Sequence, residues 1–501
     1  MGNLQHAPTM VRVVVIIYLI AILVIGVYMS KRAKSQEDYF IAGKKAPYLV
    51  AIISGSAAIM SGFGLVGIPG LAYQFGIAAM WIQVIAILGF SIAAFLVGRK
   101  MRTLAEIREV LSIPDAVALR YPSVKKTIRV LSIIGIMSGM LGYLSVEFMA
   151  LGVVLSSLFA ISFWTGALIG AAIVSVYTIL GGIASGIWTD LIQFAMEMLA
   201  GIAVLIATFV VVGNPYHMLS VLAHAPDPKM QAHAMLWWPQ GMGGIGLAGA
   251  VAWLIAFSIG HSGEPHLLAK YYVHRDIRKM KWQGMLNGIT YGIAGLMSLS
   301  GLALAALVAE GKVKPLASSN YAAPYFLLHY TPSIIAGLAF AALAAASMAT
   351  VNGFSNIGAA AISRDLIQNT FGVQLTPRKG LLLGRVMTFV VIVLALVVTY
   401  FWNSLIGIAG AAAWSTLASV FVPCIAIGLN WKRATGKGAV AGATVGVVTS
   451  IWFTVANYNP GGFFGSTLAI VLAVIAFVLV SLVTRPETLD REIERVIGMP
   501  R

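Results

Sequence analysis

Long apolar runs separated by short polar stretches dominate this chain of 501 residues. About thirteen of these runs reach the ~20 residues that an α-helix needs to cross the hydrocarbon core of a bilayer. Barrel strands would show short alternating runs instead, so we expect helices throughout. The expected spans are 11–30, 46–73, 76–98, 127–157, 162–182, 188–212, 245–269, 283–309, 332–362, 380–402, 405–430, 438–457 and 464–484. The pattern therefore predicts an all-α, polytopic membrane protein.

Two of these spans contain residues that interrupt helices. The second span holds Ser54–Gly70, a stretch rich in glycine and small hydroxyl residues. The seventh span holds Ser258–His266, with two glycines and a proline. Lipid cannot satisfy the backbone groups that a break frees, so a broken segment must lie inside the protein or line a cavity. For the first stretch the alternative is a small-residue face that packs against another helix.

The two interruptions lie five spans apart. Breaks at corresponding positions of two five-helix units are typical of inverted-repeat transporters, whose binding site lies near the membrane midplane. The repeats would be 46–212 and 245–430, within a single transmembrane domain. Helices 11–30, 438–457 and 464–484 would flank them.

Polar side chains inside the spans are candidates for the same cavity, because an ionisable group in a membrane span is costly and usually faces a pathway. Tyr143 and Glu147 lie four residues apart and so share one helix face. Asp190 opens the sixth span, where it either lies on an ion pathway or caps a helix N-terminus.

Composition narrows the class of protein. The chain is 59% hydrophobic and 10% charged, far from the roughly 25% charged residues of soluble domains. The net charge of +16 does not indicate nucleic-acid binding, because the basic residues lie between apolar runs, mainly in 31–45, 99–129, 270–281, 364–379 and 432–437. Positive loops stay in the cytoplasm. We therefore expect a multi-pass cell-membrane protein with its N-terminus outside and its C-terminus in the cytoplasm.

The sequence carries no signature of an enzyme. It contains no phosphate-cradling glycine loop followed by Lys-Ser/Thr, and no nucleophile–base pair or metal-ligand set. Cys424 is the only cysteine, which excludes a disulfide within the chain. We expect the first apolar run to be a retained span, and the tail 485–501 to form a short solvated helix. A monomer is expected to suffice, with no cofactor beyond a coupling ion.

Several motifs resemble the sodium/solute symporter family, over essentially the whole chain. They are Glu37–Gly43, Met60–Phe63, Gly67–Gly70, Ile113–Asp115, Trp188–Gln193 and Gly263–Lys270. The resemblance is to members that carry proline, acetate or pantothenate. It implies a leucine-transporter-like fold with a 5+5 inverted repeat, and transport by alternating access.

The resemblance also implies site residues. A sodium ion would be held by the carbonyls of Ala57, Met60 and Ala346 and by the hydroxyl of Thr350. Position 349 is Ala where the family usually has Ser, and position 59 is Ile where the sodium/proline symporter has Asp, so at least one ligand is missing.

In some members Asp190 belongs to a second ion site, whose serines are here replaced by Asn352 and Gly353. The solute would lie between the two breaks. The residues expected around it are Phe63, Tyr143, Glu147, His261, Glu264 and Pro265.

The predicted function is sodium-coupled import of a small organic solute, either an amino acid such as proline or a monocarboxylate. The alternative keeps the fold but couples transport to protons through Glu147, Asp190 or Glu264. A sensor is disfavoured because the tail after the last span is too short for a signalling domain. A channel is a further alternative, and an experiment that measures saturable counterflow of a labelled solute would distinguish it from a transporter.

Overall fold

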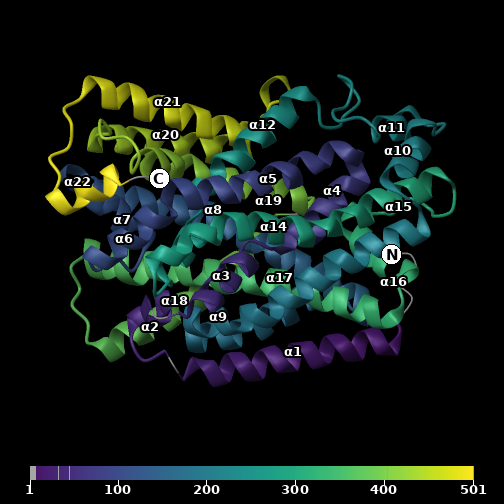
Figure 1. Cartoon of the computed structure of the whole chain (residues 1–501), viewed down its shortest axis with the longest axis horizontal. Helices are drawn as coiled ribbons and strands as arrows, with labels where there is room; N and C mark the ends of the chain where they lie inside the picture. The colour runs from purple at the N-terminus through teal and green to yellow at the C-terminus, as the bar shows by residue number, and fades with distance from the viewer. Residues whose placement is uncertain (1–6, 32, 45, 403, 500–501) are drawn as a thin grey trace.

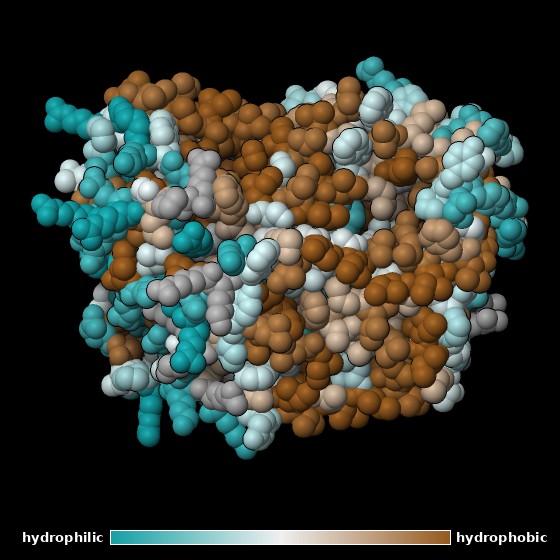
Figure 2. Space-filling view, viewed as in Figure 1, coloured by the Kyte–Doolittle hydropathy of each residue, from teal (hydrophilic) through white to brown (hydrophobic). Residues whose placement is uncertain are grey.

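The computed structural model describes residues 7–31, 33–44, 46–402 and 404–499, so Arg32 and Lys45 of the first basic loop lie outside the described residues. The described part is all-helical. Most of its long helices run along one common direction (Figure 1). Figure 2 shows a broad hydrophobic band across the middle of the visible face and hydrophilic side chains at its two ends. This is the surface of a protein that crosses a bilayer, and the prediction of an all-α membrane protein is confirmed.

Among the described residues, nine α-helices lie before the end of the first predicted repeat. They are α1 (Thr9–Ser30), α2 (Gln36–Ile41), α3 (Tyr48–Ala57), α4 (Ile68–Phe75), α5 (Met80–Ala93), α6 (Arg99–Ile107), α7 (Ile113–Arg120), α8 (Lys125–Phe159) and α9 (Phe163–Val211). A π-helical turn, η2 (Phe63–Gly67), leads into α4. The backbone therefore leaves the helix between Ala57 and Phe63, where the first break was predicted.

The second predicted repeat contains the other break. Its membrane helices are α12 (Leu247–Ser258), α13 (Pro265–Tyr272), α14 (Gln283–Gly295), α15 (Leu299–Ala309), α17 (Ser333–Ala360), α18 (Pro377–Phe401) and α19 (Ile406–Phe421). Helices α10 (Pro215–Ala223) and α11 (Pro228–Ala232) lie between the two predicted repeats, and α16 (Ala322–Tyr330) lies in a connection within the second. Helices α20 (Gly436–Val455), α21 (Gly465–Val483) and α22 (Arg491–Gly498) follow it. A short 3-10 turn, η6 (Gly260–Gly263), separates α12 from α13.

The number of long apolar helices in the described structure differs from the predicted number of membrane spans, although the positions of the spans agree. Ten helical segments within the described residues are long and apolar enough to cross a membrane, and α3 and α12 are shorter apolar helices. The difference from thirteen arises because α9 joins two predicted spans, Phe63–Ile107 joins parts of two others, and the seventh span is divided. Inside α9, Gly182 has a φ of +57° and separates the two predicted spans. The count of thirteen and the repeat boundaries stay predictions.

Helices α6, α7 and α22 gather at one end of the molecule, which we call the basic end (Figure 1). The tail helix α22 is not simply solvated there. Its apolar face, Ile493, Val496 and Ile497, is buried. The Lys100 ammonium on α6 donates to the carbonyl of Ile497 at 2.9 Å. Arg108, which follows α6, forms ion pairs with Asp490 and Glu492 of the tail.

The loop after α13 at the basic end contains a buried histidine. His274 pairs as an isolated bridge with Ala46, and its carbonyl accepts from Arg102 Nε at 2.7 Å. Burial, with a smaller contribution from the Arg102 charge, lowers the pKa of His274 to about 4. The unfolded chain then binds a proton below its ordinary pKa of 6.5 that the folded protein does not.

We expect this histidine to make the fold acid-sensitive. Its stabilising contribution is complete above pH 6.5 and is lost as the pH falls toward 4, which amounts to about 2 kcal/mol at pH 5. Thermal unfolding at pH 7 and pH 5 checks this. His274→Gln should flatten the difference, and an equal loss in both proteins would contradict the assignment.

Candidate functional site

One hydroxyl joins the first break to α17. Thr350 Oγ1 donates to the carbonyl of Met60 at 2.9 Å and is also 3.0 Å from the carbonyl of Ala346. The amide of Met60 donates to the carbonyl of Ala57 at 3.1 Å. All four residues are buried. The structure therefore brings together the four residues predicted as sodium ligands, although ion binding itself stays a prediction.

Position 349, where this chain departs from the family pattern, adjoins Thr350 of the predicted sodium site. Ala349 offers no side-chain oxygen. The nearby Ser347 hydroxyl faces the first break, since a Cβ added at Gly62 would lie 2.4 Å from Ser347 Oγ. Ser347 also donates weakly to its own helix at Leu343 O, 3.4 Å away. Among these contacts, the Ser347 hydroxyl is thus the best substitute for the side-chain oxygen that Ala349 lacks.

Helix α8 holds the first break from the other side. Glu147 Oε2 accepts from the amide of Gly62 at 2.7 Å, and Tyr143 Oη lies 3.1 Å from Ser61 Oγ. Gly62 precedes η2, so the Glu147 carboxylate covers the N-terminus of the half-helix that continues into α4. A half-helix N-terminus also suits the carboxylate of a solute. At the first break a carboxylate of the protein already occupies that place.

Aromatic rings fill the space between the two breaks. We call them the central ring cluster: Phe63, Phe90, Tyr143, Phe257, His261, His266, Phe354 and Trp414. The Phe63 ring stacks on Phe257 at 5.8 Å between centroids, and Phe257 stacks on Trp414 at 5.9 Å. The His266 ring stacks on Phe354 at 4.3 Å. Three predicted solute residues, Phe63, Tyr143 and His261, therefore belong to one cluster.

The second break ends in a buried acid. Glu264 is the N-cap residue of α13 and makes no side-chain capping bond, and Pro265 is the first residue of that helix. The side chain of Glu264 is fully buried. Neither carboxylate oxygen has a hydrogen-bond partner among the described residues. The nearest ring nitrogen is His266 Nδ1, 3.8 Å from Glu264 Oε2.

Asp190 belongs to a separate group of polar contacts, which lies nearer the basic end than the two breaks. Its Oδ2 is 2.8 Å from Lys270 Nζ and accepts from Ser54 Oγ at 2.5 Å, while Lys270 Nζ also donates to Ser54 Oγ at 2.8 Å. The three residues come from α9, α13 and α3 and are buried. Asp190 lies inside α9, so the capping alternative is wrong. A role on an ion pathway stays a prediction.

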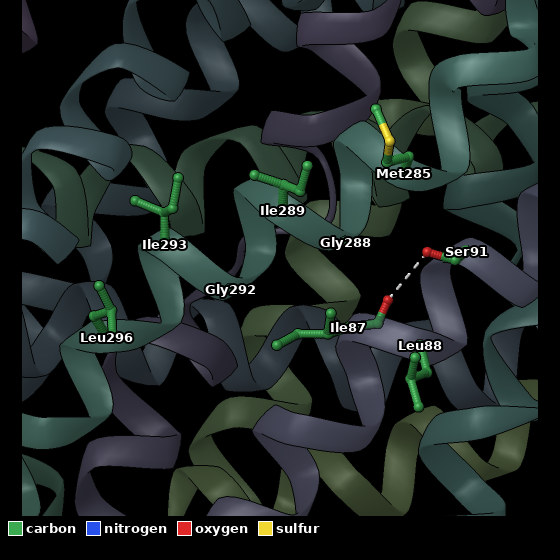
Figure 3. Close-up of a pocket in the computed structure, with 9 residues that line it drawn as sticks. All are labelled: Ile87, Leu88, Ser91, Met285, Gly288, Ile289, Gly292, Ile293 and Leu296. Atoms are coloured by element: carbon green, nitrogen blue, oxygen red, sulfur yellow. Dashed lines mark hydrogen bonds between the residues drawn. The ribbon is translucent and has the colours of Figure 1, made fainter.

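An apolar groove elsewhere on the molecule is not this site. It has a volume of about 510 Å³ and lies between α5 and α14 (Figure 3). Its lining residues are Ile87, Leu88, Ser91, Met285, Gly288, Ile289, Gly292, Ile293 and Leu296. The only side-chain hydroxyl among them, Ser91 Oγ, bonds to the backbone at Ile87 and Gly284. None of the predicted solute or ion residues lines the groove.

The fold and the site define a class of protein. Two interrupted membrane helices face each other across a buried cluster of polar and aromatic side chains, which is the arrangement of secondary transporters. The model of the sodium:solute symporter family matches residues 39–446. The chain therefore belongs to the sodium:solute symporter family, whose activity is coupled transport of sodium and a solute, and it is a transporter rather than an enzyme.

Curated relatives agree over nearly full length. The osmoregulated proline transporter OpuE of Bacillus subtilis is 27% identical over 94% of this chain and 94% of its own length. A sodium/proline symporter of Haemophilus influenzae is 26% identical over 92% of this chain and 93% of its own. The solved structure of a Na⁺-coupled sialic acid symporter superimposes with a TM-score of 0.78 at 19% identity, covering 96% of this chain and all of that one. That structure supports the fold.

The ring residues Phe90, Phe257, His266, Phe354 and Trp414 were missed by sequence reasoning. Aromatic side chains are ordinary constituents of membrane spans, so their presence alone does not mark a site. The usable signal was position, because His266 follows directly on the second break.

Proposed function

We propose that this symporter moves a small organic solute together with sodium, and that Ala57, Met60, Ala346 and Thr350 hold the ion. The observation that supports this most is the Thr350 hydroxyl, which touches carbonyls of both the first break and α17. These are hard oxygen ligands of the kind that small cations prefer. An ion bound there would connect the broken helix to α17. Its binding would therefore shift the equilibrium between conformations in which these two helices move relative to each other.

The solute belongs between the two breaks, against the central ring cluster. The relatives OpuE and the Haemophilus symporter are named for proline. We therefore propose an amino acid of proline size as the solute, with a monocarboxylate as the alternative.

The proposed orientation follows the basic residues. Helices α6, α7 and α22 carry them at one end of the molecule, which we assign to the cytoplasm, with the start of α1 outside. Import then requires the solute to enter at the α10–α11 end and leave at the basic end. We propose that a single chain in the cell membrane suffices, because both breaks and the ring cluster come from one chain.

Proton coupling is the second candidate, and Glu264 favours it. Asp190 has Lys270 as a partner and Glu147 has the amide of Gly62, whereas the Glu264 oxygens lack hydrogen bonds in the described structure. A buried carboxyl in that state is more stable with a proton. Uptake into proteoliposomes under separate sodium and proton gradients distinguishes the two, and uptake unchanged by removing sodium would exclude sodium coupling.

Thr350→Ala tests the ion site. We expect sodium to raise the unfolding temperature of the purified protein and Thr350→Ala to weaken this response at least about tenfold in sodium concentration, equivalent to ~1.4 kcal/mol. Thr399→Ala is the matched control, since Thr399 is equally buried but donates to its own helix at Ala395 O, 2.7 Å away. An equal sodium response in Thr350→Ala and in the unmodified protein would place the ion elsewhere.

A further inference from the structure

The Glu264 carboxylate lacks a compensating charge in this structure. Its side chain is fully buried and both oxygens lack hydrogen-bond donors in the part of the chain that is described. An isolated buried carboxylate is costly unless it is paired or protonated. The group therefore needs either a proton or a partner that the described residues do not supply.

The lysine closest to Glu264 in sequence is already paired with another acid. Lys270 lies on α13, six positions after Glu264, but its ammonium is 2.8 Å from both Asp190 and Ser54. Within the described residues Glu264 is paired with the His266 ring, which at 3.8 Å is beyond hydrogen-bond distance. The missing positive charge can thus come from the transported solute.

The rings that pack around His266, whose Nδ1 lies 3.8 Å from Glu264 Oε2, suit a cation as well. His266 packs on Phe354 at 4.3 Å and against Trp414 at 5.5 Å, and Tyr143 packs on Phe354 at 4.9 Å. An ammonium within about 6 Å of the face of a tryptophan or tyrosine ring is attracted by the ring quadrupole. A carboxylate that shares the neighbour His266 with such rings forms a chemical environment that selects amines.

We propose that Glu264 and the rings of Tyr143, Phe354 and Trp414 form an ammonium subsite, so that the solute carries an amine and is a zwitterion or a cation. This rests on the proposed function, since it assigns one part of the same solute site. The indole Nε1 of Trp414 is buried and has no hydrogen-bond acceptor among the described residues. It is the donor available for a carboxylate or another acceptor on the same solute.

This assignment separates the two solute classes left open above. A simple monocarboxylate would bring a second negative charge next to Glu264, and Glu147 lies at the other break. Like charges at close range in a desolvated site disfavour binding. An amino acid instead places its ammonium against the acid.

Matched ligands that differ in one group test the proposal. The probes are L-proline, pyrrolidine, which lacks the carboxylate, and cyclopentanecarboxylate, which lacks the amine, with L-alanine and propionate as a second pair. Binding to the purified full-length protein in sodium is measured by thermal shift and calorimetry. We expect L-proline or L-alanine to bind, pyrrolidine to compete, and cyclopentanecarboxylate and propionate to bind at least about tenfold more weakly.

The variant Glu264→Gln provides the second test of the ammonium subsite. It keeps the size of the side chain and removes the charge, so it should weaken the amine-bearing probes at least about tenfold and abolish their advantage over the deaminated ones. The sodium response that depends on Thr350 should remain, which keeps this test separate from that of the ion site.

Three results would overturn the ammonium subsite. One is equal binding of cyclopentanecarboxylate and L-proline, and another is the absence of stabilisation by any amine-bearing probe while the sodium response persists. The third is a Glu264→Gln variant that keeps its amine preference but loses the pH dependence of uptake, because that outcome makes Glu264 a proton carrier. Loss of the sodium response in the unmodified protein would instead contradict the proposed ion coupling.

Discussion

Substituting Lys270 with methionine is expected to abolish coupled uptake and to destabilise the protein by about 3–5 kcal/mol. The change leaves the Asp190 carboxylate buried without its cation, 2.8 Å from where the ammonium was. The Ser54 hydroxyl remains as its hydrogen-bond donor among the described residues, at 2.5 Å. Uptake into proteoliposomes and thermal unfolding of the same preparation measure the two effects.

A double variant shows whether the loss comes from the charge. Lys270→Met combined with Asp190→Asn removes both charges, and we expect it to recover much of the stability that either single variant loses. Lys312→Met is the surface control, because its pair with Glu310 at 2.9 Å is exposed on the lysine side and should contribute no more than about 1 kcal/mol. Additive losses in the double variant would show that Lys270 and Asp190 do not act as a pair.

The place of this pair suggests why uptake should fail. Lys270 and Ser54 lie on α13 and α3, the two half-helices that run from the breaks toward the basic end, and Asp190 joins both to α9. Opening that end to release solute requires these contacts to separate. Cys424 is the only cysteine, so single-cysteine variants in a Cys424→Ser background can report how open that end is.

The sequence predicted the breaks well because glycine and proline act locally. Gly260, Gly263 and Pro265 free backbone groups wherever they occur in a span, and the helix ends there in the structure as well. The same local logic placed Met60 beside a break. Its partner Thr350 lies 290 positions away, and only the family resemblance assigned it to the ion site.

Other parts of the site depend on packing that a single sequence does not contain. The sequence alone does not distinguish Lys270 from the other loop lysines, because its partner Asp190 is 80 positions away on another helix. Glu147 was expected to face the solute, yet the contact that defines it is a backbone amide. Trp414 lies in an apolar run, and what marks it is the set of rings that surround it in the fold.

Glu147 gives the second large effect that we expect. Glu147→Ala removes the acceptor for the Gly62 amide and leaves a buried N–H unpaired at the N-terminus of the half-helix formed by η2 and α4. An unpaired buried donor costs about 1–3 kcal/mol, and losing a negative group at a helix N-terminus adds up to ~1 kcal/mol. Because the same break carries Met60, the sodium response should weaken along with stability.

Glu147→Gln separates the hydrogen bond from the charge. Its side-chain carbonyl can still accept from Gly62 N, so we expect the variant to keep most of the stability that Glu147→Ala loses. Thermal unfolding and sodium titration of both variants provide the comparison. If Glu147→Gln is as unstable as Glu147→Ala, the negative charge at the half-helix N-terminus, rather than the hydrogen bond, stabilises the break. If both variants unfold like the unmodified protein, Glu147 does not hold the break, and its unpaired Oε1 becomes the better candidate for contact with the solute.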